Sequence, residues 1–276
     1  MKQINKYISE KLHINKDIKS YNYHPKTRDE LKELVDKLIE ERGNNANLND
    51  IYTSEITDMS YMFENSEFNG DISEWDVSNV KDMRYMFSKS NFNGDISKWD
   101  VSNVKYMGYM FAYSEFTGKN GDLSKWDVHN VQYMHYMFAY SEFNGDISKW
   151  NLSNVKYMTS MFYKSEFTGE NGDISEWNVS NVKDMDWMFC LSNFNGDISK
   201  WDVSNVNTMN SMFRNSKFNG DISKWNVSKV INMGTMFANS KFNGDISEWD
   251  VSKVININYM FYKSPLEKNP PKWYKE

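Results

Sequence analysis

Tryptophan recurs along the chain at a nearly constant spacing, and this self-similarity limits the possible folds more than any other feature. Consecutive members of the series are 24 or 27 residues apart: Trp75, Trp99, Trp126, Trp150, Trp177, Trp201, Trp225 and Trp249. A period of about 20–29 residues is typical of a solenoid, whose units bury their apolar side chains only by stacking on their neighbours. It is too short for a propeller blade of about 40 residues or for a helical pair of about 34.

The repeated unit reads F-N-G-D-I-S-x-W-D-V-S-N-V-x-x-M-x-x-M-F-x-x-S. Its W-D-V segment alternates apolar and polar residues, which predicts a short, half-buried strand. Its M-x-x-M-F segment, for example Met83, Met86 and Phe87, has the i, i+3, i+4 spacing of one helical face. We therefore expect an α/β solenoid with one short parallel strand and one short helix per repeat.

The segments at the two ends of the repeats are expected to act as caps. Thr27 and Glu30 form a capping box before an apolar stripe that ends at Gly43, so residues 27–42 are predicted to be an amphipathic helix. After the repeats, Leu266 and Trp273 are placed to cover the last coil. The expected organisation is a lead over 1–26, a helical cap over 27–50, about nine repeats over 51–264 and a C-terminal cap over 265–276. The sequences TGKNGD at 117–122 and TGENGD at 168–173 are expected to be loop insertions.

The motif DISxWDVSNVxxMxxMF resembles the BspA-like leucine-rich repeats, which also occur as lipoprotein repeats in mycoplasmas and in many AT-rich bacteria and viruses. The resemblance covers residues 27–264. It implies a right-handed, curved superhelix with parallel strands on one face, and a role in surface adhesion or partner binding. In the general leucine-rich pattern an Asn bonds the loop backbone, but Val80 stands at that place here. Asp71 and its equivalents are therefore expected to bond the loop instead.

Charge and composition disfavour several classes of protein. The net charge of −6, with both signs interspersed, disfavours nucleic acid as a partner, and the single cysteine excludes an intramolecular disulfide. No run approaches the roughly 20 apolar residues of a membrane span, and the first residues lack the apolar core of a signal peptide. We therefore expect a protein without membrane insertion or anchor that is cytoplasmic or virion-associated, whereas the family resemblance implies the cell surface.

Catalysis and cofactor binding are not expected. His129 and His135 have no neighbouring nucleophile motif, and Cys190 stands where other repeats have a small residue. Methionine pairs such as Met107 and Met110 are expected to fill the core rather than to bind a metal. The repeated aspartates are expected to cap turns, because one carboxylate per coil is too few for calcium. No catalytic residue, metal site or cofactor is assigned.

The repeats differ most at the outward positions of the M-x-x-M-F segment, where consecutive units are rich in tyrosine. These tyrosines are the candidate partner-binding residues: Tyr106, Tyr109, Tyr113, Tyr133, Tyr136, Tyr140, Tyr157 and Tyr163. Tyrosine offers a large, rigid contact area with a polar tip. The competing interpretation is that these rings only stack on one another along the solenoid. A second candidate surface is the predicted concave strand face with Lys98, Lys125, His129 and Lys149, which also fits a merely solvated face.

The sequence thus favours a non-enzymatic protein-interaction or adhesion module, with an unidentified protein partner such as a host surface protein, or a glycan. One alternative is a structural component of a virion or another assembly. A second alternative is carbohydrate binding through the tyrosines, because sugar rings stack on aromatic side chains. The sequence does not decide the oligomeric state.

Overall fold

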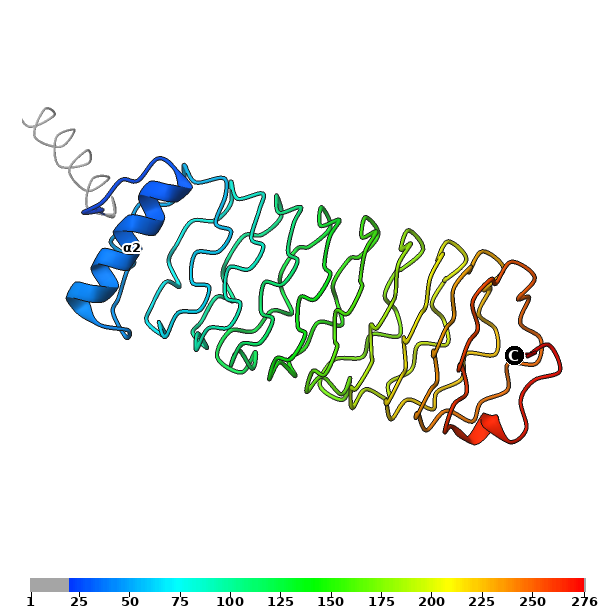
Figure 1. Ribbon diagram of the computed structural model, residues 1–276. Helices are drawn as coiled ribbons and strands as arrows, with labels where there is room; N and C mark the ends of the chain where they lie inside the picture. Colours follow the sequence, from blue (N-terminus) through cyan, green and yellow to red (C-terminus); the bar gives the residue numbers. More distant parts are fainter. Residues whose placement is uncertain (1–19, 276) are drawn as a thin grey trace, which may run out of the picture.

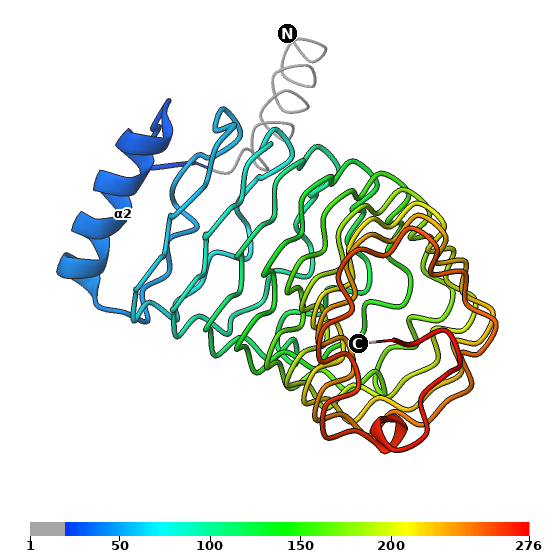
Figure 2. The same cartoon turned by 45° about the vertical axis from the view of Figure 1, so that its right-hand side comes forward.

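The computed structural model describes residues 20–275, which form a stack of similar coils with one helix packed across its N-terminal end (Figure 1). Among the described residues the helical elements are α2, Arg28–Arg42, and the short 3-10 helix η2, Pro265–Glu267. Isolated parallel β-bridges join each coil to the next. Viewed from a second angle, the coils lie nearly over one another and enclose a common core (Figure 2).

The helix expected over residues 27–42 is present as α2. The Thr27 hydroxyl accepts the backbone N–H of Glu30 at 3.2 Å, and the Glu30 carboxylate accepts the backbone N–H of Lys26 at 2.7 Å. Gly43 ends the helix with a φ of 87° and donates its N–H to the Ile39 carbonyl. The helix buries Leu31, Val35 and Leu38 against the first coil. The apolar stripe therefore covers the end of the stack, as a cap must.

The prediction of a short helix in every repeat is wrong, because the M-x-x-M-F segments are turns. In one coil the N–H of Met110 donates to the Met107 carbonyl at 3.2 Å, which closes a four-residue turn. Tyr109 inside this turn has a φ of 60°, which ends the right-handed path. The N–H of Phe111 then donates to Met137 of the next coil at 2.9 Å. These backbone groups join coils instead of building a helix.

The W-D-V segment was also assigned wrongly, since it lies between two turns and carries no β-bridge in the described chain. Trp99 donates its N–H to Ile96 at 3.2 Å, and Val104 donates to Val101 at 2.9 Å. From Asp58 to Asn256 the parallel bridges lie at the residue before the first methionine of each unit, or before Ile257 in the last one, and two further bridges, Tyr23 with Ile51 and Asn47 with Asp71, lie at the N-terminal end. Each coil is thus a series of i to i+3 turns that direct an apolar side chain inward at about every third residue. The leucine-rich-repeat class and the handedness remain predictions.

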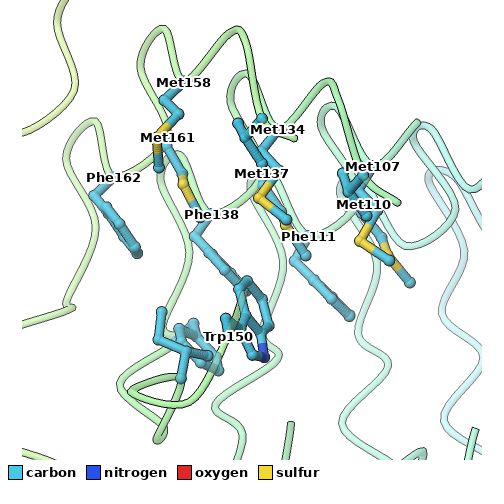
Figure 3. Packing of buried hydrophobic residues seen from close by; sticks show 14 of the residues in the cluster. Met107, Met110, Phe111, Met134, Met137, Phe138, Trp150, Met158, Met161 and Phe162 are labelled. Atoms are coloured by element: carbon cyan, nitrogen blue, oxygen red, sulfur yellow. The ribbon is translucent and has the colours of Figure 1, made fainter. Parts of the chain in front are cut away.

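The core consists of rows of identical side chains that run along the stack (Figure 3). Met107 and Met110 are fully buried, in agreement with a packing role. Phe111 and Phe138 of successive coils stack with their ring centroids 5.7 Å apart and their planes inclined by 2°. The tryptophans form a third row, in which each indole N–H donates to a carbonyl of the preceding coil, as Trp150 does at 2.9 Å. This bond satisfies the single polar group of a buried indole.

Aspartate and asparagine have separate roles in the turns. Asp122 accepts the N–H of Ser124, two residues later, at 2.8 Å, so the aspartates cap turns locally as expected. Asp71 itself accepts the N–H of Ser73 at 3.0 Å, so the aspartates bond the loop backbone as expected. The asparagine of S-N-V adds a bond between coils, because the side-chain amide of Asn154 donates to the carbonyl of His129 in the preceding coil at 2.7 Å.

At the other end, Trp273 continues the tryptophan row beyond the last repeat. Its indole N–H donates to the carbonyl of Ile246 at 2.9 Å, and its ring stacks on Trp249 with centroids 6.5 Å apart. Tyr274 packs its edge against Phe261, and Leu266 packs partly buried against the same core. The segment after residue 264 therefore covers the last coil. Of the expected N-terminal lead, residues 1–19 lie outside the described residues, while Tyr23 forms a bridge with Ile51.

Candidate binding surface

The eight candidate tyrosines form one surface, called here the tyrosine face, because each coil places its outward residues beside those of the next. One column holds the bridge residues Tyr106, Tyr133 and Tyr157. A second column holds Tyr109 and Tyr136, preceded by Tyr61 and Tyr85. A third holds Tyr113 and Tyr140. Tyr163 stands at the position that Ala139 fills in the preceding coil.

The second column is a continuous stack of rings. Centroid distances are 4.7 Å between Tyr61 and Tyr85, 4.4 Å between Tyr85 and Tyr109, and 4.5 Å between Tyr109 and Tyr136, with planes within 8° of parallel. The backbone of this column has a positive φ in coil after coil, a strained conformation for a bulky residue. The architecture, not the residue type, imposes this conformation, because Ser160 adopts it too, with a φ of 56°.

The other two columns expose more of their rings. In the bridge column the centroids of Tyr106 and Tyr133 are 5.2 Å apart, and those of Tyr133 and Tyr157 are 5.3 Å apart. Tyr113 stacks on Tyr140 at 4.3 Å and is 49% exposed, the largest exposed fraction on the tyrosine face. Stacking therefore orders the rings and still leaves their edges and hydroxyls accessible.

The regular stacking breaks at Ser160, the residue that follows Tyr136 in the second column. Beyond it the column continues with Trp187. Here the rings turn edge to face: Tyr140 meets Tyr163 at 5.0 Å and 76°, and Tyr163 meets Trp187 at 5.9 Å and 81°. The result is an open hollow of about 290 Å³, lined by Tyr113, Tyr136, Tyr140, Ser160, Tyr163 and Trp187.

Sequence reasoning missed two residues of this hollow, Ser160 and Trp187. A signal was available, because both occupy the same repeat position as Tyr109 and Tyr136. A small residue between aromatic residues in one column marks a missing ring. Only the stacked geometry of the coils shows which of the neighbouring rings line the hollow.

Two phenols of the tyrosine face, those of Tyr163 and Tyr109, have raised pKa values. A hydrogen bond with Tyr140, together with burial, raises the pKa of Tyr163 to about 12. Burial is the main cause that raises the pKa of Tyr109 above its usual range, and the neighbouring phenols add to the effect. Two cations flank the hollow: the Lys164 ammonium lies 5.0 Å from the Tyr140 ring centroid, and the Arg214 guanidinium lies 5.7 Å from the Trp187 ring. The surface thus offers aromatic faces, hydroxyls and positive charge.

The second candidate set does not form a strand face. Lys98, Lys125, His129 and Lys149 all lie in turns, because the capped I-S-x-W and V-S-N-V turns replace the expected strand. Lys98 lies 3.8 Å from the carboxylate of Glu74, and His129 lies 2.8 Å from Asp127. None of the four lines the tyrosine hollow. The three lysines are exposed at equivalent positions of successive coils, whereas His129 is half-buried at a different repeat position.

Two other side chains with reactive groups, those of His135 and Cys190, lie partly or fully buried in the coils. Burial lowers the pKa of His135, whose ring packs edge to face against Tyr109 at 5.4 Å. The Cys190 thiol is buried, and its desolvation raises the pKa to about 12. Within residues 20–275, no group of three or more His, Cys, Asp or Glu side chains could hold a metal ion. None of the helices in that range is long and apolar enough to cross a membrane.

A family model described as "Mycoplasma protein of unknown function, DUF285" matches the chain over residues 29–120, 113–190 and 165–273. The chain belongs to this family. DUF285 matches in three overlapping segments, which confirms a repeat protein of a mycoplasma-type family. The narrower assignment to BspA-like leucine-rich repeats remains a prediction. The chain matches no curated protein and no solved structure.

Proposed function

We propose that this DUF285 protein is a non-enzymatic binding or adhesion module that contacts its partner through the tyrosine face. The observation that carries the proposal is the open hollow at Ser160, where ordered tyrosine rings end and leave aromatic surface uncovered. Rigid aromatic rings lose little conformational entropy on binding and commonly anchor interfaces.

The stacked coils also support the proposal by holding the rings in place. Backbone hydrogen bonds to the next coil fix the columns. For example, the backbone N–H of Tyr109 donates to the carbonyl of His135 at 2.9 Å. A surface ordered before binding avoids part of the cost of association. We propose that the protein works at the cell surface, where an adhesive repeat of this kind meets its partner.

The test compares the wild type with a Tyr109→Ser/Tyr136→Ser variant. Serine fits the positive φ of this column, because Ser160 and Ser211 already occupy it. The matched control is Tyr259→Ser, which changes the same column in the last coil, away from the tyrosine face. Each protein is immobilised and exposed to solubilised surface material from cells, and the retained components are quantified by mass spectrometry after the melting temperatures are compared.

We expect the wild type and Tyr259→Ser to retain the same component and the double variant to lose it. Equal retention by all three proteins would contradict a binding role for the tyrosine face. Retention of only the chain itself would favour the structural alternative, in which the protein assembles with its own copies.

A further inference from the structure

One row of outward side chains separates its charges by sign along the stack. The row consists of the residue that follows the last serine of each repeat, and we call it the charge row. In chain order it holds Glu67, Asn91, Glu115, Glu142, Glu166, Asn193, Lys217 and Lys241. Backbone hydrogen bonds between coils keep the row in register, as the N–H of Lys241 shows by donating to the Ser216 carbonyl at 3.2 Å. Acidic residues therefore lie in the earlier coils and basic residues in the later ones.

The row that precedes tryptophan distributes its charges differently. There, Lys200 forms an ion pair with Glu176 of the preceding coil, so that neighbouring coils neutralise each other. In the charge row, Glu115, Glu142 and Glu166 follow one another in consecutive coils, are exposed, and form no ion pair within residues 20–275. Like charges that face each other at strand spacing repel. A partner that brings the opposite charges to this row would remove that repulsion.

The order of charges in the row is self-complementary. Three pairs of residues lie at equal distances on either side of the midpoint of the row: Glu166 with Asn193, Glu142 with Lys217, and Glu115 with Lys241. The residues just outside these pairs, Asn91 and Pro265, are uncharged. A two-fold axis through the midpoint therefore places every carboxylate between them opposite a lysine or an amide of a second copy. Such a contact uses the same surface on both copies and is complete with two chains.

The loop insertions follow the same division of the row. Both insertions, at 117–121 and 168–172, lengthen turns of the acidic half, and the basic half has none. Between them lies an open hollow of about 800 Å³, whose lining includes Glu142, Asp146 and Glu166. The two-fold axis sets the longer turns of one copy against the shorter turns of the other, and it brings Lys217 of the second copy to the coil of Glu142. Charge and turn length thus favour the same arrangement.

We infer that the protein binds a second copy of itself, antiparallel, through the charge row from Glu115 to Lys241. A uniformly basic partner would be repelled by the lysines of the row, and a uniformly acidic one by its glutamates, whereas a second copy carries both signs in the required order. The inference goes beyond the proposed function and does not depend on it, because no residue of the charge row lines the hollow at Ser160. Exposed ion pairs contribute little each, so the dimer is weak and sensitive to salt.

Sedimentation equilibrium of the full chain at about 50 and about 500 mM NaCl measures the association. The wild type should dimerise at about 100 µM protein in low salt, with a dissociation constant about tenfold or more higher in high salt. Glu142→Lys and Lys217→Glu should each weaken the dimer about tenfold or more, because the two-fold axis turns two attractive pairs into repulsive ones. Combining the two changes exchanges the charges and should restore the dimer.

The matched control is Glu40→Lys, which makes the same change of charge at an exposed carboxylate of α2 and should dimerise as the wild type does. All the substituted side chains are exposed, so the melting temperatures should agree, and their comparison separates lost association from lost folding.

A zero-length carbodiimide cross-link, which joins a carboxylate directly to an ammonium group, locates the contact. Within one chain Glu115 and Lys241 are five coils apart, or roughly 24 Å at about 4.8 Å per coil, which is too far for their side chains to meet. A bond between them therefore joins two copies. Mass spectrometry of the digested dimer should find this bond and the one between Glu142 and Lys217.

Three outcomes would overturn the inference: a wild type that stays monomeric in low salt, single charge variants that dimerise as the wild type does, or a double variant that fails to regain the dimer. The pull-down with the Tyr109→Ser/Tyr136→Ser variant is independent of these outcomes. A dimer that retains no surface partner leaves this inference standing and contradicts the proposed function, whereas a monomer that retains one does the reverse.

Discussion

The tyrosine coils at residues 104–165 and the plain coils at residues 206–264 share one backbone but present different surfaces. Both have the same inward methionines and phenylalanines, apart from Ile257 in the last coil, and the same parallel bridges and positive φ positions. At the outward sites, Tyr106 and Tyr109 of the first region correspond to Thr208 and Ser211 of the second. The inward residues are therefore sufficient to maintain the coil, and the outward residues can vary to serve binding.

The sharpest test of this equivalence is a core truncation in each region. Phe138→Ala and Phe213→Ala should each lower the free energy of unfolding by about 3–5 kcal/mol, because both rings are fully buried between two neighbouring rings. Guanidinium titration followed by tryptophan fluorescence measures both. If one truncation is nearly harmless, the two cores are not equivalent and the comparison fails.

The asparagine of S-N-V forms a row along the stack, and lysine replaces it in the plain coils. Exchanging the two residues therefore tests the row in both directions. Asn154 donates to the carbonyl of His129, whereas Lys229 stands at the matching position. Asn154→Lys should cost about 0.5–1.5 kcal/mol, the net contribution of an exposed hydrogen bond whose acceptor water can still reach, and Lys229→Asn should gain up to about 1 kcal/mol. Thermal melting checks both signs. A stabilised Asn154→Lys variant would show that the row has no structural role.

The outward rings should matter less for stability than the buried phenylalanines. Tyr136→Ser removes one stacking contact, with Tyr109 at 4.5 Å, and should cost about 0.5–1 kcal/mol. A double-mutant cycle with Tyr109→Ser isolates the ring-to-ring contribution. A coupling much larger than this would favour the interpretation that the tyrosines serve stability alone.

The sequence predicted the period, the inward residues and the capping helix, because these depend on apolar spacing and on local capping chemistry. It did not distinguish helix from turns, since Met107 and Met110 are three residues apart in both. What decides between helix and turn is the group that accepts the hydrogen bond of the Phe111 N–H, and this group is the carbonyl of Met137 in the next coil. Such a bond between coils leaves no trace in the spacing within one repeat.

The binding surface was predicted only in part, for a related reason. The tyrosines were visible as variable residues, but the hollow depends on Ser160, whose small side chain carries no chemical signal of its own. Its meaning depends on Tyr136 and Trp187 in adjacent coils. A residue that contributes by leaving space is found from the packing of its neighbours and not from its type.

The smallest predicted difference between the two regions concerns alkaline pH. Tyr163 has a pKa raised to about 12 from an ordinary value near 10, because it hydrogen-bonds Tyr140 and is partly buried, whereas Arg214 occupies the matching position in a plain coil. The folded state thus retains this proton when the unfolded state has lost it, so the contribution to stability is complete below about pH 10 and is lost as the pH rises towards 12. The phenolate absorbance of the wild type minus that of Tyr163→Phe should show one phenol titrating late. A difference curve centred near pH 10 would mean that Tyr163 is not held by Tyr140, and that this wall of the hollow is less ordered than the coils beneath it.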